Sequence, residues 1–422
     1  MPLFDLLTCL SDVSDWISPV LVHHQKQVAY IALVLAKELG MTRKEKNDLV
    51  IAGMIHDIGA LSLSERMNTL QFEYTTGHQH ALMGALLLNT FEPFQELSRV
   101  VKFHHVTWAD RNRWASAEEI PYASHLIQLA DRISILVQKD REVLGQVPEI
   151  VSRITAESGC LFDPRLVEVF RGVAEKEYFW LDIVSAKLGE RLARVSSFDT
   201  IELNPQGLLS LANLFRRLID FRSPFTATHS SGVAACASHL ARLLGLSEGE
   251  CEQILVAGYL HDLGKLAVPT ELLEKRDKLT TEEFNVIKSH TFFTYRSLEA
   301  IGGLALISSY GAFHHERLDG KGYPFHLTGH ELPLGSRIMA VADVFTAVTE
   351  DRPYRQGMTN EDAVDLLDKM ATDGKLDRSI VATLQHHFAE VNASRIAAQA
   401  TSVREYRQFV EESADEDGQK QR

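Results

Sequence analysis

Apolar residues recur at three- and four-residue spacing along most of the chain, which is typical of amphipathic helices. The clearest segments are 26–39, 47–56, 81–88, 208–219, 233–245 and 338–349. A glycine follows two of them, Gly40 and Gly245, at a place where helices commonly end. Alternating strand-like patterns bounded by turns are scarce. The sequence therefore predicts an all-α fold.

The chain also contains an internal repeat. The His-Asp pairs in MIHDIGAL and YLHDLGKL are 205 residues apart, and each follows a single histidine by 32 residues. Each half then has another histidine, a His-His pair 24 residues later, and an aspartate in an apolar helix. The first set is His24, His56, Asp57, His80, His104, His105 and Asp131, where spacing alone selects His24 over His23 and His80 over His78. The second set is His229, His261, Asp262, His290, His314, His315 and Asp343. Such matched spacing predicts a tandem duplication.

The repeat and the length of 422 residues suit two helical domains. We expect them at 1–195 and 204–402, because ARVSSFDTIELNPQG interrupts the helical pattern near 192–206. Residues 411–422, EESADEDGQKQR, have one alanine and no other apolar residue, and so predict a disordered tail.

Charge and composition narrow the class of protein. A net charge of −14 argues against DNA binding, because affinity for the phosphate backbone needs a basic face. We expect no membrane span and no signal peptide, since no apolar run reaches ~18 residues and the N-terminus has no basic start. Four scattered cysteines without a C-x-x-C pair indicate neither a disulfide framework nor a thiolate zinc site. We expect a cytoplasmic protein that holds any anionic ligand with bound metal or a local Lys/Arg cluster.

The second His/Asp set has the composition of a two-metal site. A single histidine on a helix is usually a surface or core residue, but seven candidates repeated at matched spacing favour metal binding. Five histidines and two aspartates suit two ions about 3.5–4 Å apart with one bridging carboxylate. Asp262 is the natural bridge because it adjoins His261 at a helix end. Such ions polarise a phosphodiester and lower the pKa of a shared water. Iron or manganese suits these ligands best, with zinc as an alternative.

The second half, about residues 204–400, resembles the HD-GYP family of HD-domain phosphohydrolases. Four segments carry the resemblance: HDLGKLAVP (261–269), LTTEEFNVIKSH (279–290), HHERLDGKGYP (314–324) and ADVFTAVTEDRPYR (342–355). The resemblance implies a two- or three-metal centre that hydrolyses cyclic di-GMP or a related bacterial signal such as 3',3'-cyclic GMP-AMP.

Residue roles follow from this resemblance. It implies that the second His/Asp set ligates metal and that Asp262 and Lys265 are catalytic, with Lys265 beside the scissile phosphate. It implies substrate contacts for Lys265, Arg317, Lys321, Gly322, Tyr323, Arg352 and Arg355. Taken alone, such basic residues would more often be solvated surface groups, and Gly322-Tyr323-Pro324 an ordinary turn. Phe225 stands where three-metal members carry glutamate, so we predict two metal ions.

The first half keeps the ligand set but departs elsewhere. Ala60 replaces the lysine, VTWADRNRW follows the His-His pair where the GYP loop would be, and nothing like RPYR follows Asp131. We interpret this half as a divergent HD domain with a second candidate metal site. Its role would be regulatory or structural, packing on the second half or on a partner chain, with a homodimer as an open option.

The predicted reaction is in-line attack on one phosphodiester of a cyclic dinucleotide, which gives a linear dinucleotide; a second cut to mononucleotides stays open. Two alternatives also stay open. One is a non-catalytic signalling or scaffold protein that binds cyclic dinucleotides, which the intact second set disfavours. The other is an HD phosphohydrolase for nucleoside phosphates or alarmones, which the GYP and RPYR segments disfavour.

Overall fold

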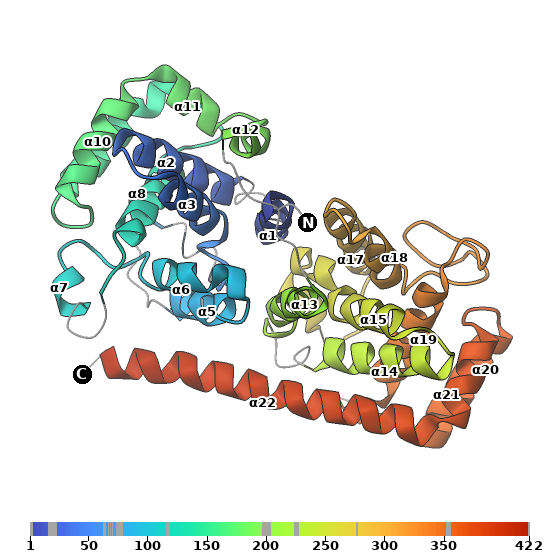
Figure 1. Ribbon diagram of the computed structural model, residues 1–422. Helices are drawn as coiled ribbons and strands as arrows, with labels where there is room; N and C mark the ends of the chain where they lie inside the picture. The colour runs from blue at the N-terminus through green and yellow to red at the C-terminus, as the bar shows by residue number, and fades with distance from the viewer. Residues whose placement is uncertain are drawn as a thin grey trace. The chain divides into compact units, whose positions relative to one another are not determined.

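The computed structural model describes residues 3–15, 23–61, 65, 67, 69, 71–72, 79–114, 119–195, 204–222, 228–275, 277–351 and 356–420. These residues form helices and two isolated bridges but no β-strand, so the predicted all-α fold is confirmed. The chain divides into two compact units (Figure 1). One unit is Glu202–Glu412, and the other is Pro2–Ile201 with Ser413–Arg422.

The first unit is organised around one buried helix, α2, which packs on α3 and α8. Its α-helices are α1 (Leu3–Asp15), α2 (His24–Glu38), α3 (Arg43–Ile55), α5 (Gln79–Leu88), α6 (Gln95–Lys102), α7 (Arg111–Trp114), α8 (Tyr122–Leu136), α9 (Val147–Ala156), α10 (Pro164–Ala174), α11 (Glu177–Ile183) and α12 (Leu188–Val195). Two 3-10 helices join them, η2 (Glu92–Phe94) and η3 (Leu144–Gln146).

The second unit repeats this plan with α14 in the place of α2. Its helices are α13 (Pro205–Asp220), α14 (His229–Leu243), α15 (Glu248–Leu260), α16 (Thr270–Leu273), α17 (Thr281–Glu299), α18 (Ala305–Ala312), α19 (Leu334–Thr349), α20 (Asn360–Thr372), α21 (Arg378–His386), α22 (Phe388–Lys420) and the 3-10 helix η4 (Leu263–Ala267). Here α14 packs on α15 and α19.

The helices that lead into the two His-Asp pairs start and end alike. A capping box of Ser247 and Glu250 begins α15, and α3 begins at an equivalent box 205 residues earlier. In each box the two side chains satisfy backbone N–H groups that the helix start leaves unpaired. Both helices then run up to the histidine of the pair, because His56 and His261 are their C-cap residues.

Close helix contact places these C-caps beside the start of the preceding helix. A Cβ atom on Gly258 would lie 2.4 Å from the Cα of Ala234, and one on Gly53 would lie 2.6 Å from the Cα of Ala29. A side chain at either glycine would collide with backbone, so glycine permits the close crossing. The crossings of α2 with α3 and of α14 with α15 are therefore built in the same way.

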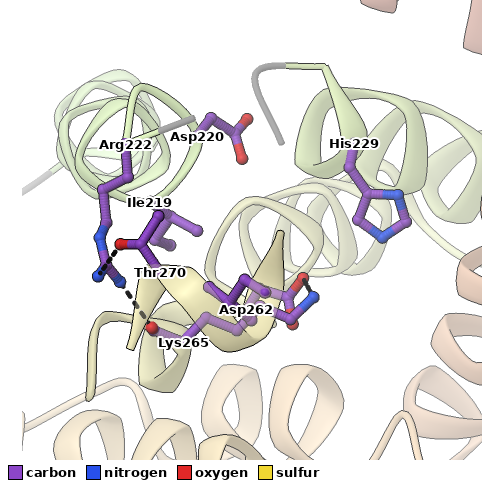
Figure 2. Close-up of a pocket in the computed structure, with 8 residues that line it drawn as sticks. Ile219, Asp220, Arg222, His229, Asp262, Lys265 and Thr270 are labelled. Atoms are coloured by element: carbon purple, nitrogen blue, oxygen red, sulfur yellow. Dashed lines mark hydrogen bonds and ion pairs between the residues drawn. The ribbon is translucent and has the colours of Figure 1, made fainter. Parts of the chain in front are cut away.

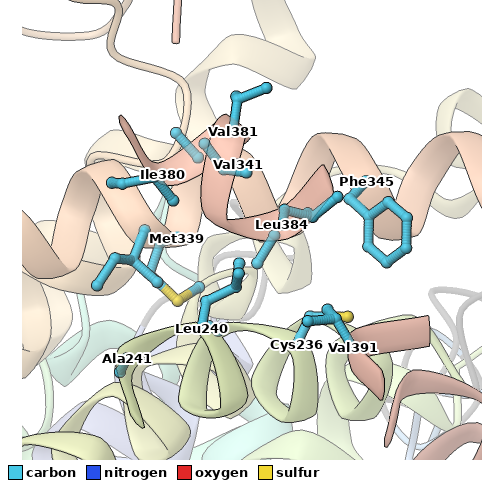
Figure 3. Close-up of a cluster of buried hydrophobic side chains, with 14 of the residues drawn as sticks. Cys236, Leu240, Ala241, Met339, Val341, Phe345, Ile380, Val381, Leu384 and Val391 are labelled. Carbon is cyan, nitrogen blue, oxygen red and sulfur yellow. The ribbon is translucent and has the colours of Figure 1, made fainter. Parts of the chain in front are cut away.

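The apolar core of the second unit holds α14 and α19 together (Figure 3). Leu240 of α14, Phe345 of α19 and Leu384 of α21 are all fully buried in this cluster. Burial of a side chain of this size stabilises the fold by about 1.5–3 kcal/mol. The core thus fixes α14, which begins with His229, and α19, which carries Asp343.

The last helix, α22, extends through residues 411–420. The disordered tail over 411–422 stays a prediction. The lack of apolar residues argues against burial, not against helix. Ala, Glu, Gln and Lys are good helix formers, and an established helix is extended without the cost of a new nucleus. None of the described helices combines the length and the apolarity that a membrane crossing requires.

Candidate metal centre and active site

The structure brings all seven predicted ligands of the second unit together. They come from separate elements: His229 begins α14, His261 caps α15, His290 lies in α17 and Asp343 in α19, while the His-His pair follows α18. Their donor atoms form three overlapping groups in which all atoms lie within 4.8 Å of one another. The groups are His229, His261 and Asp343; His261, Asp262 and His314; and His290, His314 and His315.

Asp262 belongs to the middle one of these groups, and its two oxygens face different histidines. Its Oδ2 is 3.2 Å from Nε2 of His261, whereas its Oδ1 is 3.4 Å from Nε2 of His290 and 4.0 Å from Nε2 of His314. A carboxylate whose two oxygens point to different sets of donors can bridge two ions. This geometry supports the predicted role of Asp262 as the bridge.

Backbone carbonyls set the tautomers of three histidines. Nδ1 of His261, His290 and His314 lies 2.7, 2.6 and 2.7 Å from the carbonyl oxygen three residues earlier. A carbonyl oxygen only accepts, so Nδ1 carries the proton and Nε2 presents its lone pair to the centre. The local helix geometry therefore prepares these side chains to ligate.

His229 is held differently, by a carboxylate that the sequence analysis missed. Its Nδ1 lies 3.2 Å from both oxygens of buried Glu350, and its Nε2 lies 3.1 Å from Oδ1 of Asp343. Nε2 of Gln399 in α22 donates to Glu350 at 3.2 Å. Burial lowers the pKa of His229, but Glu350 and Asp343 outweigh it and raise this pKa to about 10. A metal ion bound at Nε2 would displace the proton there.

His290, His314 and Asp262 are in the protonation states that ligate. Burial lowers the pKa of His290 to about 3 and that of His314 well below its ordinary value. Burial alone would raise the pKa of Asp262, but His261 and Lys265 hold it well below its ordinary value. Neutral imidazoles and ionised carboxylates are the forms that bind divalent cations.

Two buried atoms test whether these residues fit a metal ion. Nε2 of His261 and Oδ1 of Asp262 are buried and make no hydrogen bond within the described part of the chain. A buried polar atom without such a bond costs about 1–3 kcal/mol. Both atoms point into the ligand set, where a divalent cation would satisfy them. The donors therefore fit metal binding.

A cavity opens beside the centre (Figure 2). Nζ of Lys265, whose side chain is 24% exposed, donates to Oδ2 of Asp262 at 2.6 Å. Arg222 fixes the backbone here, since its guanidinium donates to the carbonyl of Lys265 at 2.7 Å and to Oγ1 of Thr270 at 3.0 Å. The cavity is lined by Ile219, Asp220, Arg222, His229, Asp262, Lys265, Thr270 and Leu273. Sequence reasoning missed Asp220 and Arg222, which no motif marks.

The GYP loop folds back onto the His-His pair. The ring of Tyr323 lies 4.9 Å from that of His315, and the backbone N–H of Tyr323 donates to the carbonyl of His315 at 3.2 Å. A Cβ on Gly322 would lie 2.4 Å from the Cα of Glu316, so only glycine fits this approach. The buried Glu316 carboxylate accepts the backbone N–H groups of residues 325–327. Together these contacts place Tyr323 at the edge of the centre.

The remaining predicted substrate contacts are less directly supported. Arg317 forms an ion pair with Asp319 at 2.5 Å, and Lys321 is exposed on the same loop. No described contact links either side chain to the metal ligands. Two of the predicted substrate contacts, Arg352 and Arg355, lie outside the described residues. So does Phe225, on which the two-metal prediction rests.

The seven candidate ligands of the first unit also converge. Their donors form two compact groups, one of Asp57, His80, His104 and His105 and one of His24, His56 and Asp131. Asp57 belongs to the first group and links it to the second, since its two oxygens face different histidines. Its Oδ2 is 3.5 Å from Nε2 of His56, and its Oδ1 is 3.4 Å from Nε2 of His80. Both histidines that spacing alone selected, His24 and His80, lie in the set.

Comparison with known proteins agrees with this duplication. Models of the HD domain match residues 21–136 and 213–380. The 3'3'-cGAMP-specific phosphodiesterase 1 of Vibrio cholerae is 29% identical over 93% of this chain and 93% of its own length. The 3'3'-cGAMP-specific phosphodiesterase 3 of that organism is 30% identical over 63% of this chain and 57% of its own. The cyclic di-GMP phosphodiesterase response regulator RpfG of Xanthomonas campestris is 41% identical over 35% of this chain and 40% of its own.

The fold is shared with a solved structure as well. A crystal structure titled as a cyclic GMP-AMP specific phosphodiesterase of V. cholerae, V-cGAP3, aligns with a TM-score of 0.63 at 23% identity. The alignment covers 92% of this chain and 98% of that chain. Three observations lead to one assignment. HD-domain models match both halves, a relative spans both halves, and the GYP loop packs against the ligand set. The chain belongs to the HD-GYP family, as a tandem HD-domain protein whose first domain has diverged.

Proposed function

We propose that the second domain hydrolyses a phosphodiester bond of a bacterial cyclic dinucleotide to give a linear dinucleotide. The observation that carries this proposal is the position of Asp262. One of its oxygens faces His261 and Lys265, the other faces His290, and a cavity lies alongside. The activities named for the relatives, which act on cyclic di-GMP or 3'3'-cGAMP, support the substrate class.

The ligand set suits two divalent ions, with iron or manganese as our first choice. When bound, such ions supply Lewis-acid polarisation of the phosphate and a water of lowered pKa as the nucleophile. The protein's own part is to hold the donors in place: the carbonyls behind His261, His290 and His314, and Glu350 behind His229, fix the direction of each imidazole.

Lys265 and Tyr323 supply the contacts with the substrate that the structure supports best. The partly exposed Nζ of Lys265 can turn from Asp262 to a phosphate oxygen, where it offsets charge or helps to protonate the leaving 3'-oxygen. Tyr323 presents an aromatic face beside His315, on which a base can stack. Arg317, Lys321, Gly322, Arg352 and Arg355 stay predicted contacts from the family resemblance.

Among cyclic dinucleotides, 3',3'-cyclic GMP-AMP is the first to test. The 3'3'-cGAMP-specific phosphodiesterase 1 matches 93% of this chain, whereas RpfG, named for cyclic di-GMP, matches 35% of it. We place the reaction in the cytoplasm, in keeping with four free cysteines. A homodimer stays a prediction.

A substrate panel tests the proposal. Protein purified without oxygen and loaded with iron or manganese is incubated with 3',3'-cyclic GMP-AMP, cyclic di-GMP and GTP, and products are separated by chromatography. We expect a linear dinucleotide from a cyclic substrate and no product from GTP. Binding of a cyclic dinucleotide by calorimetry without any product would support the scaffold alternative instead. Hydrolysis of GTP alone would support a nucleotide phosphohydrolase.

A further inference from the structure

The first domain prepares its histidines for metal as the second domain does. Nδ1 of His56 and of His104 lies 3.0 and 2.6 Å from the carbonyl oxygen three residues earlier. Nδ1 of His24 lies 3.1 Å from Oγ of Ser134, whose hydroxyl donates to Gln27 and so can only accept from His24. All three imidazoles therefore carry the proton on Nδ1 and present Nε2 to the centre.

The centre contains buried atoms whose hydrogen-bonding capacity is unused. Nε2 of His24, His56 and His104 and Oδ1 of Asp57 are buried and make no hydrogen bond within the described part of the chain. Each residue is at most 4% exposed. Four such atoms, divided between the two donor groups of this domain, would be costly in an empty core. A divalent cation held by nitrogen and oxygen donors removes this cost.

Access to this centre differs from that in the second domain. Arg132, only 3% exposed, donates to Oδ2 of the candidate ligand Asp131 through its Nε at 3.1 Å and through its Nη2 at 2.5 Å. The same guanidinium donates to the carbonyls of Thr69 at 3.0 Å, of Phe72 at 3.3 Å and of Gln71. Arg132 therefore fastens these three backbone carbonyls next to a ligand. In the second domain the residue after Asp343 is Val344, which can make no such bond.

The bridging aspartate is also contacted differently. Oγ1 of Thr69 donates to Oδ2 of Asp57 at 3.2 Å, whereas Oδ2 of Asp262 receives the Nζ of Lys265. Ala60 occupies the position equivalent to Lys265 and brings no charge. The first domain thus has an inward-facing hydroxyl where the second has a partly exposed cation.

We propose that the first domain holds its own divalent transition-metal centre, closed by Arg132 and Thr69, which stabilises that domain and does not hydrolyse phosphodiesters. The ion would be iron, manganese or zinc, bound by both groups of donors around Asp57. This inference concerns the first domain alone and holds whether or not the second domain has the activity proposed above.

Matched variants of the full chain test the metal site. Asp57→Asn and Asp262→Asn change equivalent aspartates, one in each domain, and metal per chain is measured by mass spectrometry. We expect each variant to lose part of the wild-type metal, and Asp57→Asn to unfold at a lower temperature while it still turns over cyclic dinucleotide. Wild-type metal content in Asp57→Asn would overturn the proposal.

A second measurement keeps the test valid if Asp57→Asn does not fold. Metal-stripped Asp262→Asn is titrated with Mn²⁺ by calorimetry, because its first-domain ligands are intact. We expect Mn²⁺ binding and a higher unfolding temperature with Mn²⁺. Absence of binding in folded protein would overturn the proposal. Adding Asp57→Asn, where the double variant folds, should abolish the binding.

The closure is tested by the rate at which metal leaves. Arg132→Val introduces the residue that the second domain has at this position, and it is made in the Asp262→Asn chain so that first-domain metal is observed. We expect release to a chelator to speed up by about 10–100-fold, the usual scale for loss of a group that supports a ligand. An unchanged rate would contradict closure by Arg132.

Discussion

Nζ of Lys265 lies 2.6 Å from Oδ2 of Asp262, so this ammonium group contacts the carboxylate whose two oxygens face His261 and His290. We predict that Lys265→Met retains bound metal but lowers kcat by about 10²–10³-fold, because a positive charge that can turn to the phosphate is lost from the cavity. Steady-state kinetics and metal analysis of the same preparation check this. Lys278→Met, a change at an exposed lysine, is the control. Full turnover in Lys265→Met would remove this residue from the mechanism.

Glu350 should act through His229. Its carboxylate contacts Nδ1 of that histidine and so fixes the direction of Nε2. We predict that Glu350→Gln weakens metal binding by about 10–100-fold, as expected for loss of a carboxylate behind a ligand histidine. Titration of the metal-stripped protein with Mn²⁺ measures the effect, and exposed Glu361→Gln serves as the control. Equal affinities in the two variants would mean that Glu350 does not orient the ligand.

The position of the GYP loop depends on Gly322. A methyl group there would meet the Cα of Glu316 at 2.4 Å and the backbone N of Arg317 at 2.5 Å, so the loop must shift. We predict that Gly322→Ala costs about 1–3 kcal/mol of stability and raises KM through displacement of Tyr323, with metal content unchanged. Gly329→Ala, whose new methyl would come no closer than 3.3 Å to Cδ2 of Leu318 and 3.7 Å to its backbone oxygen, should behave like wild type. An unchanged KM in Gly322→Ala would show that the loop does not bind substrate.

The sequence predicted the all-α fold and the two His/Asp sets that the structure brings together, because both leave regular marks. Apolar spacing is a local property, and the offset of 205 residues between His56 and His261 can be counted directly. The starts of helices were predicted less accurately. The helix predicted over 233–245 begins at His229. Its first turn is polar, so apolar spacing does not mark it, and contacts with the surrounding elements position it instead. The resemblance to the HD-GYP family supplied the roles that counting could not.

Contacts between distant elements could not be predicted in this way. Glu350 is 121 residues from His229, and Arg132 reaches carbonyls about sixty residues away. No periodicity connects such pairs, since they depend on how helices cross and which rotamers the core allows. The Glu350–His229 pair and the Arg132 contacts, on which the proposed closure of the first centre rests, therefore emerged only from the structure.

The central claim is that metal held by the second His/Asp set carries out the hydrolysis of a cyclic dinucleotide. The most direct measurement strips the protein with a chelator, restores Fe²⁺ or Mn²⁺ stepwise without oxygen, and counts the linear dinucleotide formed from 3',3'-cyclic GMP-AMP and from cyclic di-GMP. We predict no product from stripped protein and product that rises with bound metal until the second domain is filled, with Asp262→Asn inactive at every step. Turnover that persists in stripped protein, or none from either substrate in a fully loaded chain, would contradict the account.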